Sequence, residues 1–296
     1  MPVDLAGRRP RVGGLRRDAR AGRRPAGAAV SLPPRLAATV ALIRRDALIY
    51  TSYRGRLVTQ SVGTVFTLAL FYYVSKLVRV EPFHSPKEYF GFVVVGLVIL
   101  QVLQSTLESP MQLRQELVAG TFERMALSPF GPTASVASLM IFPFALASIM
   151  SAVTLALAVV IFGVRLHWAT VALAIPVGLL GALSFAPLTL LMSAVMLRFK
   201  QAPGASYIIA LVSLSAGLYF PTSLLPGWIR WASEVQPFTP AVELLRHLLL
   251  GLPLTESTWV SLAKMVGFAI VGLPLAGAAV GMAIRSCRRN GTLVEY

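Results

Sequence analysis

The stretch Trp168–Leu197 reads WATVALAIPVGLLGALSFAPLTLLMSAVML and contains no Asp, Glu, Lys or Arg. A helix needs about 20 predominantly apolar residues to cross the hydrocarbon core of a bilayer, so this stretch is long enough to span a membrane. The same holds for three other charge-free intervals, Met125–Val164, Gln201–Ile229 and Met265–Ile284. We therefore expect an all-α, polytopic membrane protein.

The composition of the whole chain agrees with this expectation. Of its 296 residues, 56% are hydrophobic and 13% are charged, whereas soluble domains are about 25% charged. The net charge of +15 could suggest nucleic acid, but 13 of the 27 Lys and Arg residues precede Leu57. No aromatic interleaving or recognition motif accompanies them, so we expect no nucleic-acid partner. The single Cys287 excludes an internal disulfide and a Cys-based metal site.

Hydropathy and charge placement predict six transmembrane helices. They are expected at about Leu57–Val78, Tyr89–Leu107, Ala134–Gly163, Trp168–Leu197, Pro203–Leu224 and Trp259–Ile284. Six spans put both termini on one side, and with the N-terminus inside, that side carries 20 of the 27 Lys and Arg residues. Because the inside of a bacterial membrane protein is rich in Lys and Arg, we expect an inner-membrane protein with both termini cytoplasmic.

Two segments precede the first span. Residues 1–30 carry eight arginines among Gly, Ala and Pro, which predicts a disordered tail. The tail either attracts anionic lipid headgroups or has no selected role. Residues 31–56 are predicted to form an amphipathic helix on the membrane surface, since apolar residues recur at helical spacing opposite Arg44 and Arg45. The transmembrane domain is expected over residues 57–296.

The connection between spans two and three, Glu108–Thr133, is longer than a turn. It holds Pro110, a helical stretch to Ala119, a stop at Gly120 and a fresh N-cap at Thr121. This pattern predicts two short cytoplasmic helices at an angle, the second over Phe122–Leu127.

The connection between spans five and six, Pro226–Ser257, is also long. Trp228 and Trp231 are three residues apart, which suits the level of the lipid headgroups. Thr239-Pro240 is expected to open a helix that Gly251 closes. We expect short helices that dip into or lie on the outer leaflet.

The sequence contains no energy source of its own. The central spans lack the ionisable residues that bind a coupling ion, which disfavours gradient-driven transport. None of the four lysines follows Gly or precedes Ser or Thr, as a phosphate-binding loop requires. The three histidines form no catalytic or metal-binding pattern with other residues. If the protein does work, its energy must come through contact with another subunit.

Two stretches resemble a known family. Gln115–Pro129, QELVAGTFERMALSP, resembles the coupling-helix region of type 2 ABC exporters. Tyr219–Trp228, YFPTSLLPGW, with Gln236–Pro240 and Leu245-Arg246, resembles the outer re-entrant region of that family. Both lie between the appropriate spans, and the resemblance covers the chain from Arg35 onward.

The resemblance implies a permease that is not itself an enzyme. Two ATPase subunits would bind ATP and Mg²⁺ and dock below the permease, which would pair with a second copy or with a paralogous permease among membrane lipids. This chain itself would hold no cofactor. The residues at or beside the ATPase contact would be Glu116, Gly120, Thr121, Phe122, Glu123 and Arg124, with Arg44 and Arg45 in the connecting helix.

The resemblance also places the dimer contact and the transport pathway around spans two and five. Candidates for the pathway or its gate are Ser206, Ser213, Phe220 and Pro221. Apolar spans without charge clusters favour a lipophilic or amphipathic cargo such as a drug, lipid or glycolipid. The alternatives are a polysaccharide or glycoconjugate exporter of the same family, a gradient-driven carrier, a membrane-bound enzyme or a passive anchor.

Overall fold

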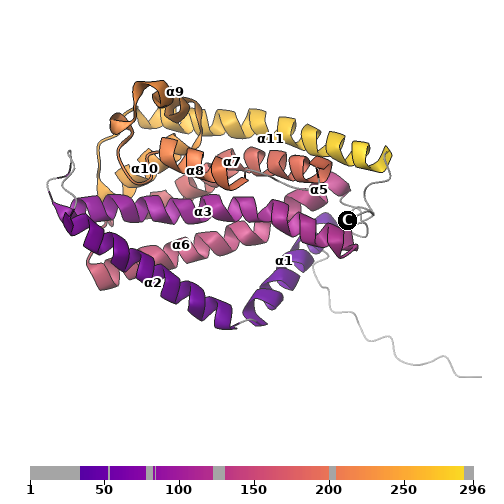
Figure 1. The fold of residues 1–296 in the computed structure, drawn as a ribbon, viewed down its shortest axis with the longest axis horizontal. Helices are drawn as coiled ribbons and strands as arrows, with labels where there is room; N and C mark the ends of the chain where they lie inside the picture. Colours follow the sequence, from indigo (N-terminus) through magenta and orange to yellow (C-terminus); the bar gives the residue numbers. More distant parts are fainter. Residues whose placement is uncertain are drawn as a thin grey trace, which may run out of the picture. The chain divides into compact units, whose positions relative to one another are not determined.

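The computed structural model describes residues 34–52, 54–77, 83, 85–122, 131–199 and 205–289, and every regular element among them is a helix. The predicted tail over residues 1–30 lies outside the described residues. The helices are α1 (Pro34–Ser52), α2 (Arg54–Leu77), α3 (Pro86–Val118), α5 (Pro132–Ser138), α6 (Ile141–Phe162), α7 (Val171–Phe199), α8 (Ala205–Ser215), the 3-10 turn η1 (Thr222–Leu224), α9 (Gly227–Val235), α10 (Phe238–Leu250) and α11 (Thr258–Arg289) (Figure 1).

Five helical segments in the described part of the chain, not the expected six, are long and apolar enough to cross a membrane. They are Val58–Leu77 within α2, then α3, α5 with α6, α7 and α11. The expected fifth span, Pro203–Leu224, is represented by α8, whose 11 residues are too few for a bilayer. Length and hydropathy suggested a full span, but the backbone turns at Gly217, whose φ of 66° is left-handed.

In the sequence between α7 and α11, the chain nevertheless runs back along the bundle. These two helices run parallel, because Gly181 lies near Met265 at one end and Leu197 accepts a hydrogen bond from Cys287 at the other. The return path includes α8 and the irregular residues after it. The orientation of the termini relative to the membrane remains a prediction.

Two other helix boundaries differ from expectation. α3 runs unbroken through Pro110 to Val118, so the first of the two expected short helices is the end of a span. Pro110 removes one backbone hydrogen bond, but the helix continues on both sides of it. The expected third span divides at Leu139–Met140 into α5 and α6.

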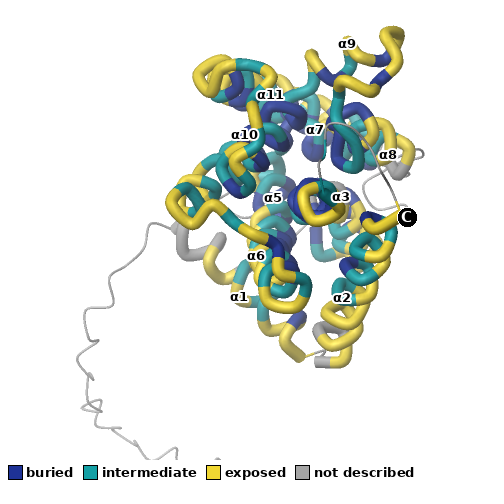
Figure 2. The backbone as a smooth tube through the Cα atoms, turned by 90° about the vertical axis from the view of Figure 1, so that its left-hand side faces the viewer, coloured by how far each residue is buried: buried dark blue, intermediate teal, exposed yellow. Residues whose placement is uncertain are grey.

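α3 is the centre of the helical packing (Figure 2). Ser85 caps its N-terminus by accepting a hydrogen bond from the Glu88 backbone N–H, and Pro86 occupies the first turn. About 69% of the most apolar stretch of α3 is buried, whereas 11% of the corresponding stretch of α2 is buried. Polar bonds join α3 to α6: Gln101 and Thr154 lie 3.0 Å apart, and Ser151 donates to the Val98 carbonyl at 2.9 Å. Such bonds hold helices together in an apolar surrounding.

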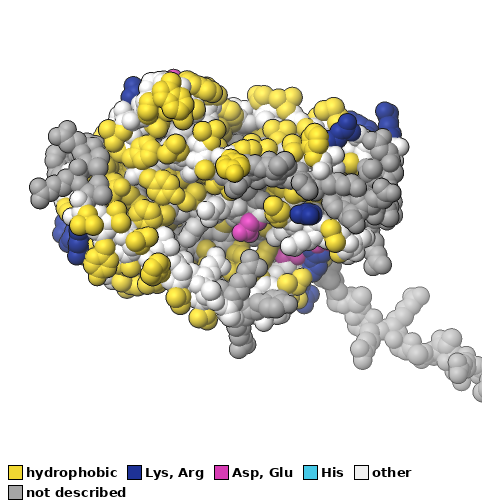
Figure 3. All heavy atoms as spheres, viewed as in Figure 1, with side chains coloured by type: hydrophobic (Ala, Val, Ile, Leu, Met, Phe, Trp, Pro, Cys, Tyr) yellow, Lys and Arg dark blue, Asp and Glu magenta, His cyan; other side chains and the backbone are white. Residues whose placement is uncertain are grey.

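Apolar side chains cover much of the face shown in Figure 3. On α2 the exposed apolar and aromatic residues follow one helical stripe. They are Val58, Val62, Phe66, Leu70, Tyr73 and Leu77. A large exposed apolar surface of this kind needs lipid or another protein against it.

Candidate functional sites

The end of α3 is tied to α1 by a charged contact, which we call the Arg45 joint (Arg45, Glu116 and Thr121). Arg45 Nη2 donates to Glu116 Oε1 at 2.8 Å, and Arg45 Nε donates to the neighbouring Asp46 at 2.9 Å. The other carboxylate oxygen of Glu116 accepts a short hydrogen bond from the Thr121 hydroxyl. One carboxylate therefore connects α1, the last turn of α3 and the residue after Gly120.

The Arg45 joint is partly shielded from solvent. The Arg45 side chain is 40% exposed and that of Glu116 is 15% exposed. Burial lowers the pKa of Arg45, but the hydrogen bonds and negative charges of Asp46 and Glu116 outweigh burial and raise the pKa above its ordinary value. The arginine is thus held charged beside its partners.

The turn after α3 depends on Gly120 and Phe122. Gly120 has a φ of 66°, which a side chain would strain. Phe122 is 2% exposed and packs in one cluster with Leu113 and Leu117 of α3 and with residues of α5, α7 and α11. This anchor fixes where the chain leaves α3.

Of the other residues expected at this end of α3, the structure describes only Arg44. Arg44 lies on α1 and is exposed. Glu123 and Arg124 lie outside the described residues, as does most of the expected second short helix. The structure thus brings together Arg45, Glu116, Gly120, Thr121 and Phe122.

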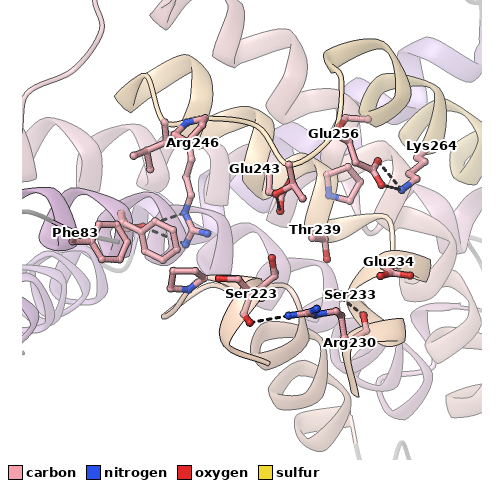
Figure 4. Close-up of a pocket in the computed structure, with 18 residues that line it drawn as sticks. Phe83, Ser223, Arg230, Ser233, Glu234, Thr239, Glu243, Arg246, Glu256 and Lys264 are labelled. Atoms are coloured by element: carbon pink, nitrogen blue, oxygen red, sulfur yellow. Dashed lines mark hydrogen bonds and ion pairs between the residues drawn. The ribbon is translucent and has the colours of Figure 1, made fainter. Parts of the chain in front are cut away.

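A second polar site lies near the opposite end of α3 and is shown in Figure 4. We call it the Glu243 pocket, and its volume is about 540 Å³. It is lined by the described residues Phe83, Phe92, Pro221, Thr222, Ser223, Arg230, Ser233, Glu234, Thr239, Pro240, Glu243, Arg246, Leu252, Pro253, Thr255, Glu256, Ser261 and Lys264. The lining therefore combines three carboxylates and three cationic side chains with hydroxyl groups.

Arg246 forms one wall of the Glu243 pocket and is only 5% exposed. Its guanidinium donates to the Gly217 and Leu218 carbonyls at 2.8 Å each and to the Phe92 carbonyl at 3.3 Å. It also lies 3.3 Å from the centre of the Phe92 ring. The bonds to Gly217 and Leu218 satisfy carbonyls that the break after α8 leaves outside regular helix.

Burial lowers the pKa of Arg246 to about 9, and the charge of Glu243 acts in the opposite direction. Arg246 is therefore still protonated at neutral pH. Burial raises the pKa of the Glu243 carboxyl, opposed by a hydrogen bond from Thr255 at 3.1 Å and by the charge of Arg246. Lys264 and Glu256 form an ion pair at 2.6 Å on the same pocket.

The candidate pathway residues do not form one cluster with the Arg45 joint. Ser213 is buried in α8 and donates to the Ala210 carbonyl at 2.9 Å, so its hydroxyl is occupied within its own helix. Phe220 is half-buried after α8, and Pro221 lines the Glu243 pocket. Ser206 belongs to α8, but its side chain lies outside the described residues.

Sequence reasoning missed the role of Arg246. Glu243 and Arg246 are three residues apart on α10, a spacing that allows an ion pair on one helix face, but the structure gives Arg246 backbone carbonyls from α3 and the turn after α8. The signal available in the sequence was an arginine within an apolar run, between Leu244-Leu245 and Leu248–Leu250, which indicates a buried helix. Burial of that kind predicts a partner but does not identify it.

The comparisons with known proteins give one result. A sequence model of the family described as ABC-2 type transporter matches residues 37–250, which is more than half of the chain. A search of curated proteins found no match. The matched range includes both the Arg45 joint and most of the Glu243 pocket.

Proposed function

Because the chain belongs to the ABC-2 type transporter family, we propose that it is the permease of an exporter powered by two separate ATPase subunits. Its cargo in this proposal is lipophilic or amphipathic: a drug, a lipid or a glycolipid. The protein works in the cytoplasmic membrane with both termini inside. Membership of the family supports the permease role, and the sequence and contacts described above support the finer points.

The Arg45 joint is the observation that carries the proposal. An ATPase that pushes on the segment after Gly120 moves Thr121, and Thr121 shares the Glu116 carboxylate with Arg45 of α1. A push there therefore acts on α1 and α3 together. α3 is the most buried of the five candidate spans, so its movement shifts the helices packed on it.

A second copy of the chain completes the proposed transporter. The family resemblance points to spans two and five for this contact, and α3 is largely covered by helices of its own chain. The free surface in this region is on α8, where Tyr207, Leu211 and Leu214 are exposed at helical spacing. We therefore place the second copy against α8.

An amphipathic cargo fits the two environments that the chain offers. The described spans are apolar, whereas the Glu243 pocket supplies charges and hydroxyls. The apolar part of a cargo is compatible with the first environment and its polar part with the second.

The test begins with the full-length chain purified together with its ATPase and placed in lipid vesicles. We expect uptake of a fluorescent amphipathic dye that requires ATP. Dye uptake that follows an ion gradient without nucleotide would overturn the proposal.

The same vesicles test coupling through Glu116→Gln, which keeps the shape of the side chain and removes its charge. We expect the ratio of dye transported to ATP hydrolysed to fall about fivefold, the upper range for one partly exposed ion pair. Arg45→Gln should lower the ratio similarly, and the double variant should be no worse than either. The control is Lys76→Gln, which removes an exposed charge near the Tyr72 ring, outside both the Arg45 joint and the lining of the Glu243 pocket, and should leave the ratio unchanged. An equal loss in the control would mean that the Arg45 joint has no special role.

A further inference from the structure

α7 and α11 end beside a hollow lined by arginines, which we call the arginine pocket. It has a volume of about 430 Å³ and is lined by Arg198, Met282, Arg285, Ser286 and Arg289. Figure 3 shows basic side chains gathered over this end of α11. None of these five residues is acidic, so three positive charges converge on one hollow and the described part of its lining holds no carboxylate.

The arrangement of these charges is unfavourable without an anion. Arg285 and Arg289 are four residues apart on one helix and therefore lie on the same face, where like charges repel. Arg198 adds a third charge from the last turn of α7. Arginines at helix C-termini interact favourably with the helix dipole, but the dipole does not require arginines of two helices to line the same hollow.

Hydrogen bonds and buried contacts join α7 and α11 at the arginine pocket. The Arg198 guanidinium donates a short hydrogen bond to the Ser286 hydroxyl, and Cys287 donates to the Leu197 carbonyl at 3.1 Å. Leu197 and Cys287 are both buried between the two helices. Because the helices are joined in this way, the three arginines are held near one another before any ligand binds.

An apolar stripe leads to the pocket along α11. Leu275 and Met282 are seven residues apart on one helix face and are 65% and 58% exposed. Arg289 follows on the same face after another seven residues. A phospholipid matches this arrangement, because its acyl chains can lie along the apolar stripe while its phosphate lies beside the arginines. A free phosphate would use the arginines but not the stripe.

We propose that the arginine pocket binds the phosphate group of an anionic phospholipid, whose acyl chains lie along Leu275 and Met282. Arginine suits this ligand because its planar guanidinium donates two parallel hydrogen bonds to phosphate oxygens. Basic pockets between transmembrane helices bind anionic headgroups by the same chemistry. This lipid site goes beyond the proposed transport function, and it does not depend on the identity of the cargo.

The test measures lipid binding to the purified full-length chain by native mass spectrometry in detergent. We expect phosphatidylglycerol to remain bound and phosphatidylcholine to bind at least tenfold more weakly. Arg285→Gln with Arg289→Gln should weaken phosphatidylglycerol binding about tenfold or more, because hydrogen bonds between charged groups are lost. The matched control is Arg288→Gln, which removes a charge at the same helix end but does not line the pocket.

Three outcomes would overturn the proposal. The first is equal phosphatidylglycerol binding by the double variant and the Arg288→Gln control. The second is equal binding of phosphatidylcholine. The third is full displacement of the lipid by an equal concentration of glycerol 3-phosphate or inorganic phosphate, which would assign the pocket to a soluble phosphate. Arg285→Lys with Arg289→Lys keeps the charge and should retain part of the binding, which separates loss of a ligand from loss of the fold.

Discussion

The two halves of α3 contact arginines in different ways. Near its C-terminal end, Arg45 is 40% exposed and binds the carboxylate of Glu116. Near its N-terminal end, Arg246 is 5% exposed and donates to the carbonyl of Phe92 in α3 and to the carbonyls of Gly217 and Leu218. A partly exposed ion pair contributes about 0–1 kcal/mol and can be remade, whereas unpaired buried carbonyls cost about 1–3 kcal/mol each. The first contact is suited to a joint that moves, and the second to a support that does not.

The largest expected effect comes from removing the support. Arg246→Met keeps a long side chain but leaves the Gly217 and Leu218 carbonyls without their donor. We expect a loss of about 2–6 kcal/mol in the free energy of unfolding, from two orphaned carbonyls. Thermal unfolding of the detergent-purified protein measures it. The control Arg230→Gln removes an exposed arginine that donates to a single carbonyl, that of Ser223, and should change the melting temperature little. Similar melting temperatures for the two variants would contradict the contrast drawn above.

Gly96→Ala tests the same support from the side of α3. A Cβ at Gly96 would overlap the carbonyl oxygen of Leu218, which is backbone and cannot rotate away. We expect a loss of about 1–3 kcal/mol, the usual cost of overpacking, read as a lower melting temperature. Gly178→Ala is the control, since its Cβ would meet nothing within 4 Å. It should be neutral or stabilising by about 0.5–1 kcal/mol, because alanine favours helix. Equal melting temperatures for the two variants would mean that α3 can move away from the turn after α8.

The sequence predicted the parts of this comparison unequally. Charge-free intervals located the long helices because a bilayer imposes their length and composition. Gly120 was identified as a stop because the helical pattern ends there, and the structure gives it a left-handed backbone. The break in the expected fifth span was missed, since Gly217 lies in an interval whose hydropathy is sufficient for a full helix. Arg246 was missed as a support for a related reason: its partners are backbone carbonyls, which are present at every residue and leave no pattern.

The Arg45 joint could be predicted only in part. The sequence indicated both Arg45 and Glu116, but as separate contacts for an ATPase. They are 71 positions apart in the sequence, so their pairing depends on how α1 packs beside the end of α3. Helical periodicity predicts which face of each helix is apolar. It does not determine which polar residues of two distant helices will meet.

The smallest expected effect concerns the pH dependence of the Glu243 pocket. Because burial raises the pKa of Glu243, the folded state holds the carboxyl proton more tightly than the unfolded chain does. Its contribution to stability is therefore greatest at low pH and declines as pH rises from the ordinary value of 4.5 through the raised folded value. Glu243→Gln removes this titration, so we expect the variant to gain stability relative to the native chain as pH rises from 4.5 to 7. Thr255, Arg246 and Glu256 interact with the carboxyl, Lys264 pairs with Glu256, and all four stay unchanged in the variant. Melting temperatures of both proteins, measured across this pH range, test the direction of the change in relative stability. If the native chain gained stability relative to the variant as pH rises, Arg246 and Thr255 would outweigh burial in setting the pKa of Glu243.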